Sequence, residues 1–149
     1  MANDPESSTG RQHVSGRALI LHPERLKVTI EELKTLRGAP PWDEIIVQTD
    51  RYIITAICQA PGHRNDWHYH LADECWTVYE GELSWTMEGR PEPIHAGPGD
   101  WIFAPANTFH LIRVHGDRPA IRFGIIYTGE FHRRERSDMP PAPDGTGSD

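Results

Sequence analysis

Hydrophobic positions along this chain favour strands over helices for most of its length. From Glu44 onward, the apolar residues no longer follow a helical spacing. The stretches 44–48 and 51–58 are rich in β-branched and aromatic residues and are joined by Thr49-Asp50, so they predict a hairpin. The same composition predicts further strands near 66–70, 74–80, 82–88, 91–95, 100–104, 108–115 and 120–128. Many short strands about 8–12 residues apart, separated by Gly, Pro and Asp, predict an all-β sandwich or barrel.

The chain before this region predicts one short helix. Residues 29–32 have the form of a capping box, in which a Thr hydroxyl and a Glu carboxylate satisfy each other's backbone amides. Leu33 and Leu36 are expected to face inward, and Gly38 is expected to end the helix. Residues 17–22 predict a short strand that could pair with a neighbouring sheet or a second subunit.

The two ends of the chain differ in composition from its middle. Residues 1–16 are polar and small, which predicts a flexible N-terminal arm. Residues 137–149 are rich in Pro, Gly and Asp, which predicts a disordered C-terminal tail. Residues 17–136 therefore form the expected single domain, a size consistent with one modest core.

Two stretches place metal-ligand residue types at suggestive spacings. His68 and His70 are two residues apart, so an extended chain directs both imidazoles to one face. Glu74 follows at an even spacing and can return its carboxylate to that face. A second stretch, beginning at Gly99, ends at His110. Three imidazoles and one carboxylate suit a first-row transition metal better than calcium or magnesium.

These residues also resemble the two sequence motifs of the cupin superfamily. The first motif, G-x5-HxH-x3-E-x6-G, is matched at Gly62, His68, His70, Glu74 and Gly81. The second motif is matched at Gly99, Pro105 and His110, and it departs at Asn107, where the family has glycine, and at Val114, where it often has asparagine. Asparagine tolerates the left-handed backbone better than most residues, so the turn before His110 can keep its conformation.

The resemblance implies a small single-domain cupin of the cupin 2 type, with a double-stranded β-helix, or jelly-roll, barrel after the short N-terminal helix. It implies that His68, His70, Glu74 and His110 hold one divalent metal ion. Iron(II) is the first expectation, and manganese, nickel, cobalt or zinc would fit the same ligands. Four protein ligands leave coordination positions open, as catalytic metal sites require.

Three functions fit such a site. The first is a non-haem iron(II) dioxygenase acting on a small oxygenated organic substrate. The second is a redox-neutral isomerase, cyclase, decarboxylase or lyase that stabilises an enolate. The third is a non-catalytic module that binds a small ligand. Resemblance to some cupin dioxygenases implies that Glu74 could leave the metal during turnover and serve as a base.

Five residues are candidates for contacting a substrate. Trp76 should share the ligand face, and Arg122 could bind a carboxylate. Phe103 and Tyr127 are expected to continue the inner walls, and His63 is the remaining histidine nearest the motif. The structural alternatives are an aromatic core for the tryptophans, a surface ion pair for Arg122 and a solvent-facing loop for His63. Some lyases of the superfamily carry a tyrosine at the position of Trp76, and its phenolic oxygen acts as a base. Trp76 has no phenolic oxygen, which argues against that chemistry here.

Tryptophans 67, 76, 85 and 101 all lie near the motifs, and core packing is the expectation for each. Neither cysteine is expected to take part in the chemistry: Cys75 directly follows Glu74 and should point away from the metal. Structural zinc sites usually carry cysteines in close pairs, whereas Cys58 and Cys75 are isolated.

The formal net charge of −7 argues against nucleic acid as a partner. No apolar run approaches the ~18 residues that a membrane span needs, and no secretory signal is apparent at the N-terminus. Isolated cysteines fit a reducing cytoplasm, so a cytoplasmic location is expected. The expected partners are a small-molecule substrate and a second copy of the chain in a homodimer.

Overall fold

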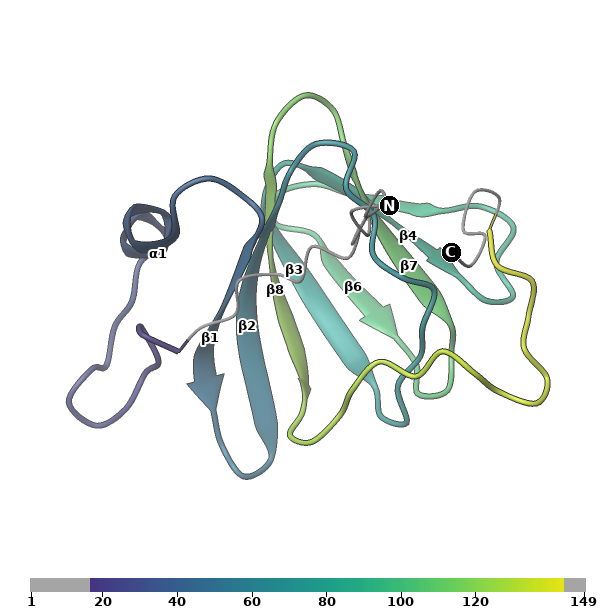
Figure 1. The fold of residues 1–149 in the computed structure, drawn as a ribbon, viewed down its shortest axis with the longest axis horizontal. Helices are drawn as coiled ribbons and strands as arrows, with labels where there is room; N and C mark the ends of the chain where they lie inside the picture. Colours follow the sequence, from purple (N-terminus) through teal and green to yellow (C-terminus); the bar gives the residue numbers. More distant parts are fainter. Residues whose placement is uncertain (1–16, 144–149) are drawn as a thin grey trace, which may run out of the picture.

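The computed structural model describes residues 17–143, which contain one helix and eight strands (Figure 1). In chain order these are α1 (Ile30–Arg37), β1 (Trp42–Gln48), β2 (Tyr52–Gln59), β3 (Glu74–Glu80), β4 (Glu82–Met87), β5 (Ile94–Ala96), β6 (Trp101–Ala104), β7 (His110–His115) and β8 (Ala120–Tyr127). The expectation of a β fold with one short N-terminal helix is confirmed. The predicted arm at 1–16 and residues 144–149 of the predicted tail lie outside the described residues.

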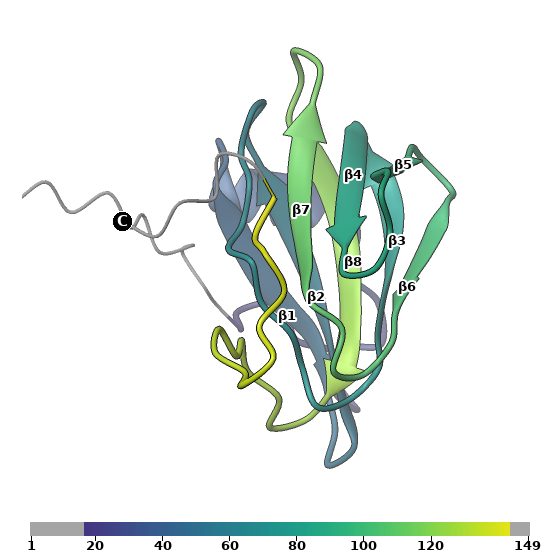
Figure 2. The same cartoon turned by 90° about the vertical axis from the view of Figure 1, so that its right-hand side faces the viewer.

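Two antiparallel sheets form the fold. The larger has the strand order β1-β2-β8-β3-β6, and the smaller has the order β5-β4-β7. The predicted hairpin is the β1–β2 pair, and the two sheets face each other without closing into a continuous barrel (Figure 2). No helix within residues 17–143 has the length and apolar composition needed to cross a membrane.

Helix α1 begins and ends where the sequence predicts. The Thr29 hydroxyl accepts a hydrogen bond from the Glu32 amide at 3.2 Å, and the Glu32 carboxylate accepts one from the Thr29 amide at 2.6 Å. Gly38 ends the helix with a φ of 70°. Ile30 and Leu33 are buried, but Leu36 is 48% exposed, so its predicted inward position is wrong. Successive helical residues rotate by about 100°, which carries Leu36 to the edge of the buried face.

Two of the predicted strands are not regular strands. Residues 17–22 contact β1 of the larger sheet through two hydrogen bonds, from the Leu21 amide to the Ile46 carbonyl at 2.7 Å and from the Leu19 amide to the Glu44 carboxylate at 3.0 Å. The chain then turns at Pro23, which has no amide hydrogen to donate to a strand pairing, and His22 forms an isolated bridge with Arg25. Residues 66–70 form isolated bridges, His68 with His110 and Tyr69 with Arg133.

The core lies between the facing sheets. Its largest members include Trp76 and Trp85, whose ring centroids are 5.6 Å apart. Trp67 is also buried, so core packing is confirmed for three of the four tryptophans near the motifs. It is wrong for Trp101, which is 64% exposed, because the alternation of β6 turns Ile102 and Ala104 inward instead.

The segment after β8 returns across the molecule. In Figure 2 this segment, drawn in yellow, runs beside the chain that leads into β3. The backbone of Tyr69 bonds to that of Arg133 in both directions, at 2.9 and 3.0 Å. The Arg136 guanidinium forms an ion pair with Glu88 and so anchors the far end of the segment. This C-terminal segment, residues 129–138, therefore covers the end of the fold where His68 and His110 meet.

Candidate metal centre

Backbone pairing brings four ligand-type side chains to one point between the sheets. Glu74 is the first residue of β3 and His110 the first residue of β7. The His68 amide bonds to the His110 carbonyl at 3.2 Å, and the His110 amide bonds to the His68 carbonyl at 2.8 Å. One side-chain ligand atom from each of His68, His70, Glu74 and His110 lies within 4.8 Å of the others. The spacing of these four residues in the sequence thus corresponds to a compact group of nitrogen and oxygen ligand atoms in the structure.

The turn before His110 holds this arrangement. Asn107 has a φ of 60°, the left-handed conformation expected at the position where the motif has glycine. Its amide bonds to the His70 carbonyl at 2.7 Å. The Asp73 carboxylate accepts a hydrogen bond from the Ala106 amide at 2.8 Å. The two motifs are therefore tied to each other through the backbone next to the ligand-type residues.

Burial leaves several of these atoms without a protein partner. His68, His70 and His110 are 1%, 5% and 1% exposed. Nε2 of His70 and of His110 lie 3.3 and 3.4 Å from Oε2 of Glu74. Among the described residues, none of these three atoms has a hydrogen-bond partner. Unpaired buried polar atoms cost free energy, and a cation at their meeting point would remove that cost, so the residues fit a bound metal ion.

The imidazoles of His68 and His70 are held in the neutral state that binds metal. Burial lowers the pKa of His68 far below its ordinary value, and the neighbouring His110 and His132 lower it further. Burial also lowers the pKa of His70, against the opposing charge of Glu74. Nδ1 of His68 lies 2.9 Å from the Asp66 carbonyl, which favours a proton on Nδ1 and leaves the Nε2 lone pair free. Neutral rings with a free Nε2 are the form that coordinates a cation.

The C-terminal segment adds His132 to this site. Its ring stacks on that of His68 with centroids 3.5 Å apart, and its Nδ1 lies 2.9 Å from Oδ1 of Asp66. Burial raises the pKa of Asp66, but the hydrogen bond with His132 and the charges of His68, His132 and Arg134 lower it by more. Asp66, His68 and His132 form a second close group of ligand-type atoms. Because His132 lies beyond the last predicted strand, no periodicity in the sequence could have placed it here.

Two predicted substrate residues lie on the inner face near the four ligands. Trp76 is 2% exposed, and its ring centroid is 5.2 Å from that of His110. Arg122 is 3% exposed and donates to Gln59, so it is not the surface ion pair that was the alternative. Burial lowers the pKa of Arg122 to about 10, while the charge of Glu74 opposes that change. Nε of Arg122 has no hydrogen-bond partner within residues 17–143.

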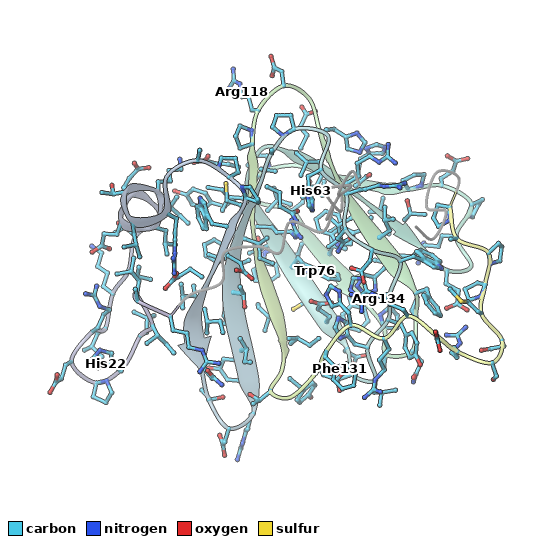
Figure 3. All side chains as sticks on the ribbon, viewed as in Figure 1. His22, His63, Trp76, Arg118, Phe131 and Arg134 are labelled. Atoms are coloured by element: carbon cyan, nitrogen blue, oxygen red, sulfur yellow. The ribbon has the colours of Figure 1, made fainter. Side chains whose placement is uncertain are left out.

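The other three predicted substrate residues lie away from the four ligand-type residues. Phe103 and Tyr127 are 57% and 59% exposed, on the outer face of the larger sheet rather than on an inner wall. Their strands alternate, and the inward positions fall on the neighbouring residues. The His63 carbonyl accepts from the Val114 amide at 2.8 Å, at the opposite end of β7 from His110. Figure 3 labels His63, Trp76 between the sheets, and Arg134 on the C-terminal segment.

Comparison with known proteins finds similar sequences and similar folds. A family model described as a cupin domain matches residues 57–126. A dimethylsulfoniopropionate lyase, DddQ from Ruegeria pomeroyi, is 42% identical over 64 residues, which is 43% of this chain. The chain covers only 30% of the length of that curated relative.

Solved structures share the fold at low sequence identity. A protein with a double-stranded β-helix domain from Klebsiella pneumoniae has a TM-score of 0.60 at 19% identity, and the match covers 74% of this chain and 98% of that protein. A cupin superfamily protein from Desulfitobacterium hafniense has a TM-score of 0.57 at 20% identity, with 75% and 97% covered. An RmlC-like cupin from Methanocaldococcus jannaschii has a TM-score of 0.55 at 24% identity, with 61% and 84% covered. The predicted jelly-roll architecture is therefore confirmed.

Proposed function

We propose that this chain, which matches a cupin-domain family model over residues 57–126 and has the cupin fold, binds a divalent transition metal ion and acts as a metal-dependent lyase. The observation that carries this proposal is the buried group of His68, His70, Glu74 and His110, in which Nε2 of His70, Nε2 of His110 and Oε2 of Glu74 have no partner within residues 17–143. The similarity to a dimethylsulfoniopropionate lyase favours elimination over oxygenation. The native metal is left open between iron, manganese, cobalt, nickel and zinc, since all accept this ligand set.

The substrate that we propose is dimethylsulfoniopropionate or a small carboxylic acid with a comparable leaving group. In such an elimination, a proton leaves the carbon next to the carboxylate and the bond from the following carbon to sulfur breaks. Sulfur takes the electron pair, so the products are acrylate, dimethyl sulfide and one proton. A bound metal would supply a Lewis acid that stabilises the negative charge developing on the substrate carboxylate.

The protein groups near the four ligands match the charges of such a substrate. The Arg122 guanidinium, with its free Nε, is suited to binding the carboxylate. The indole face of Trp76 is suited to a sulfonium cation, because aromatic faces attract positive charge. Trp76 has no basic group that could accept a proton, so we assign the role of proton acceptor to the Glu74 carboxylate, through Oε1, the oxygen that would not hold the metal ion.

The C-terminal segment would exclude water from this chemistry. His132 covers one face of His68, and the Glu130 carboxylate accepts a hydrogen bond from the Leu71 amide at 3.0 Å. A closed, low-dielectric site strengthens every charge interaction inside it. It also limits the substrate to a small molecule.

The direct test is an anaerobic assay of the full chain loaded with each of the five metals in turn. Incubation with dimethylsulfoniopropionate should release dimethyl sulfide, measured in the headspace by gas chromatography, together with an equal amount of acrylate. Firm metal binding without product from this substrate or its analogues would contradict the lyase proposal. In a parallel assay in air, oxygen uptake by the iron-loaded protein would instead support the dioxygenase predicted from the sequence. Saturable binding without product would support the non-catalytic module.

A second test concerns the proposed binding of the substrate carboxylate by Arg122. Replacing Arg122 with Met keeps the buried volume similar and removes the positive charge. We expect KM to rise about tenfold to a hundredfold, since a hydrogen bond to a charged group contributes about 1.5–3 kcal/mol. Arg113→Met on the exposed surface of β7 is the matched control and should leave KM unchanged. An unaltered KM in a variant with the wild-type circular dichroism spectrum would remove Arg122 from the site.

A further inference from the structure

The outer face of the larger sheet is apolar over three neighbouring strands. Cross-strand pairing places the outward residues side by side, with Cys75 opposite Phe103 and Ile125, and Thr77 opposite Trp101 and Phe123. Tyr127 continues the row on β8, and Tyr79 continues it on β3. None of these outward positions carries a charged side chain. We call this surface the aromatic face; its members are Cys75, Thr77, Tyr79, Trp101, Phe103, Phe123, Ile125 and Tyr127.

Helix α1 covers only the other part of the same face. Its Ile30 and Leu33 pack with Trp42, Cys58 and Ile121, on β1, β2 and the start of β8. Figure 1 shows α1 beyond β1, at the opposite side of the larger sheet from β6. An antiparallel sheet with one solvated face normally alternates apolar inward residues with polar outward ones. Strands β3, β6 and β8 break that rule, which indicates that a second layer covers them.

The exposed aromatic side chains are large enough to form an interface. Trp101, Phe103, Tyr79 and Tyr127 are 64%, 57%, 49% and 59% exposed. Since a large aromatic side chain buries about 150–250 Å² when fully covered, these four offer roughly 400–500 Å². A stable interface buries about 800 Å² per partner, so the four aromatics supply more than half and their half-buried neighbours can supply much of the rest. A patch of this size is comparable to the largest apolar patch on a typical monomeric protein, and such patches often mark interaction sites.

We propose that a second copy of this chain covers the aromatic face, in a symmetric dimer with the larger sheets packed face to face. A two-fold axis along β3 would lay β6 of one copy against β8 of its partner, so aromatic side chains meet on both sides of the axis. The absence of charged groups favours a self-complementary partner over one chosen by charge. Strand β3 would then carry Glu74 on its inner face and the dimer contact on its outer face, which leaves the metal site clear of the interface.

This proposal replaces the N-terminal strand as the expected dimer contact. The Leu21 amide bonds to Ile46 of the same chain, so residues 17–22 are occupied within their own subunit. The dimer interface proposed here rests on the aromatic face instead, and it does not depend on whether the metal site is catalytic.

Sedimentation velocity of the full chain tests the proposal. The mass obtained for the wild type should be twice the chain mass of 16.9 kDa. Phe103→Glu and, separately, Tyr127→Glu should weaken the dimer at least a hundredfold and give a monomer at micromolar concentration, because each places a charge inside the interface. Leu26→Glu changes an exposed apolar residue outside the aromatic face, 83% exposed, and should remain dimeric. A monomeric wild type, or dimeric Phe103→Glu and Tyr127→Glu variants, would overturn the proposal.

Tryptophan fluorescence gives an independent measurement. Trp42, Trp67, Trp76 and Trp85 are 1%, 8%, 2% and 0% exposed, so Trp101 is the tryptophan that acrylamide can reach in a monomer. Quenching should be weak in the wild-type dimer, rise on dilution, and be strong at all concentrations in Phe103→Glu. Strong quenching in a wild-type sample that sediments as a dimer would place the contact elsewhere. Metal content should be the same in both proteins.

Discussion

Replacing His70 with Ala is expected to reduce the bound metal from about one ion per chain to a small fraction of that. His70 supplies a buried Nε2 that has no hydrogen-bond partner in the described part of the chain. Substitutions of residues that merely support metal ligands weaken metal affinity or activity by about 10–100-fold, so loss of a ligand itself should cost at least about a hundredfold. The measurement is elemental analysis after dialysis against a weak chelator, followed by competition with a coloured indicator.

His95 provides the matched control for that substitution. It is an exposed histidine on β5, and its ring lies 5.3 Å from that of His115 rather than near Glu74. His95→Ala should therefore keep the full metal content and the full rate of any reaction. If His70→Ala retained metal as tightly as the wild type, the convergence of the four side chains would not be a metal site. If both variants lost metal equally, the loss would reflect general destabilisation.

Gly81→Ala should be the most destabilising single-methyl change in the turns between strands. Gly81 joins β3 to β4 with a φ of 80°, a conformation that residues with a Cβ rarely adopt. A Cβ here would lie 2.8 Å from the Ala120 Cα and 2.9 Å from the Pro119 carbonyl oxygen, which are backbone atoms that cannot move aside cheaply. We expect a loss of about 3 kcal/mol or more in the free energy of unfolding, by adding overpacking to backbone strain. Urea unfolding followed by circular dichroism measures it.

Gly89→Ala separates these two causes. Gly89 has a similar φ of 75°, but no atom of the described residues lies within 4 Å of the place that a Cβ would occupy there. Its substitution should therefore cost only the strain of the left-handed backbone, about 1–2 kcal/mol. Equal losses in the two variants would show that the close approach of β8 to the β3–β4 turn is unimportant for stability.

The sequence predicted the ligand-type group because its members lie close together along the chain. His68, His70 and Glu74 fall within one motif, and the even spacings place their side chains on one face. The capping box of α1 was predictable for the same reason, since all of its interactions lie within four residues. Local spacing therefore carries both the helix start and three of the four metal-ligand positions.

Contacts between distant segments could not be predicted in this way. His132 stacks on His68 only because the C-terminal segment turns back and pairs with residue 69. The alternation of β6 was visible in the sequence, but the sequence did not show which side chains face inward, because both faces of this strand carry apolar residues. Trp101 and Phe103 were therefore expected inside, whereas the smaller Ile102 and Ala104 take the inward positions.

Glu74 and Cys75 are adjacent on β3 but face opposite sides of the sheet, and this limits how the sequence of the strand can vary. Adjacent residues of one strand serve separate surfaces, one directed at the imidazoles and one at the solvent-side sheet face. Point substitutions can thus alter either surface independently. An insertion or deletion of a single residue within β3 would exchange the two, turning the carboxylate outward and the thiol inward. Natural variants should accordingly tolerate many side-chain replacements in this strand while keeping its length constant.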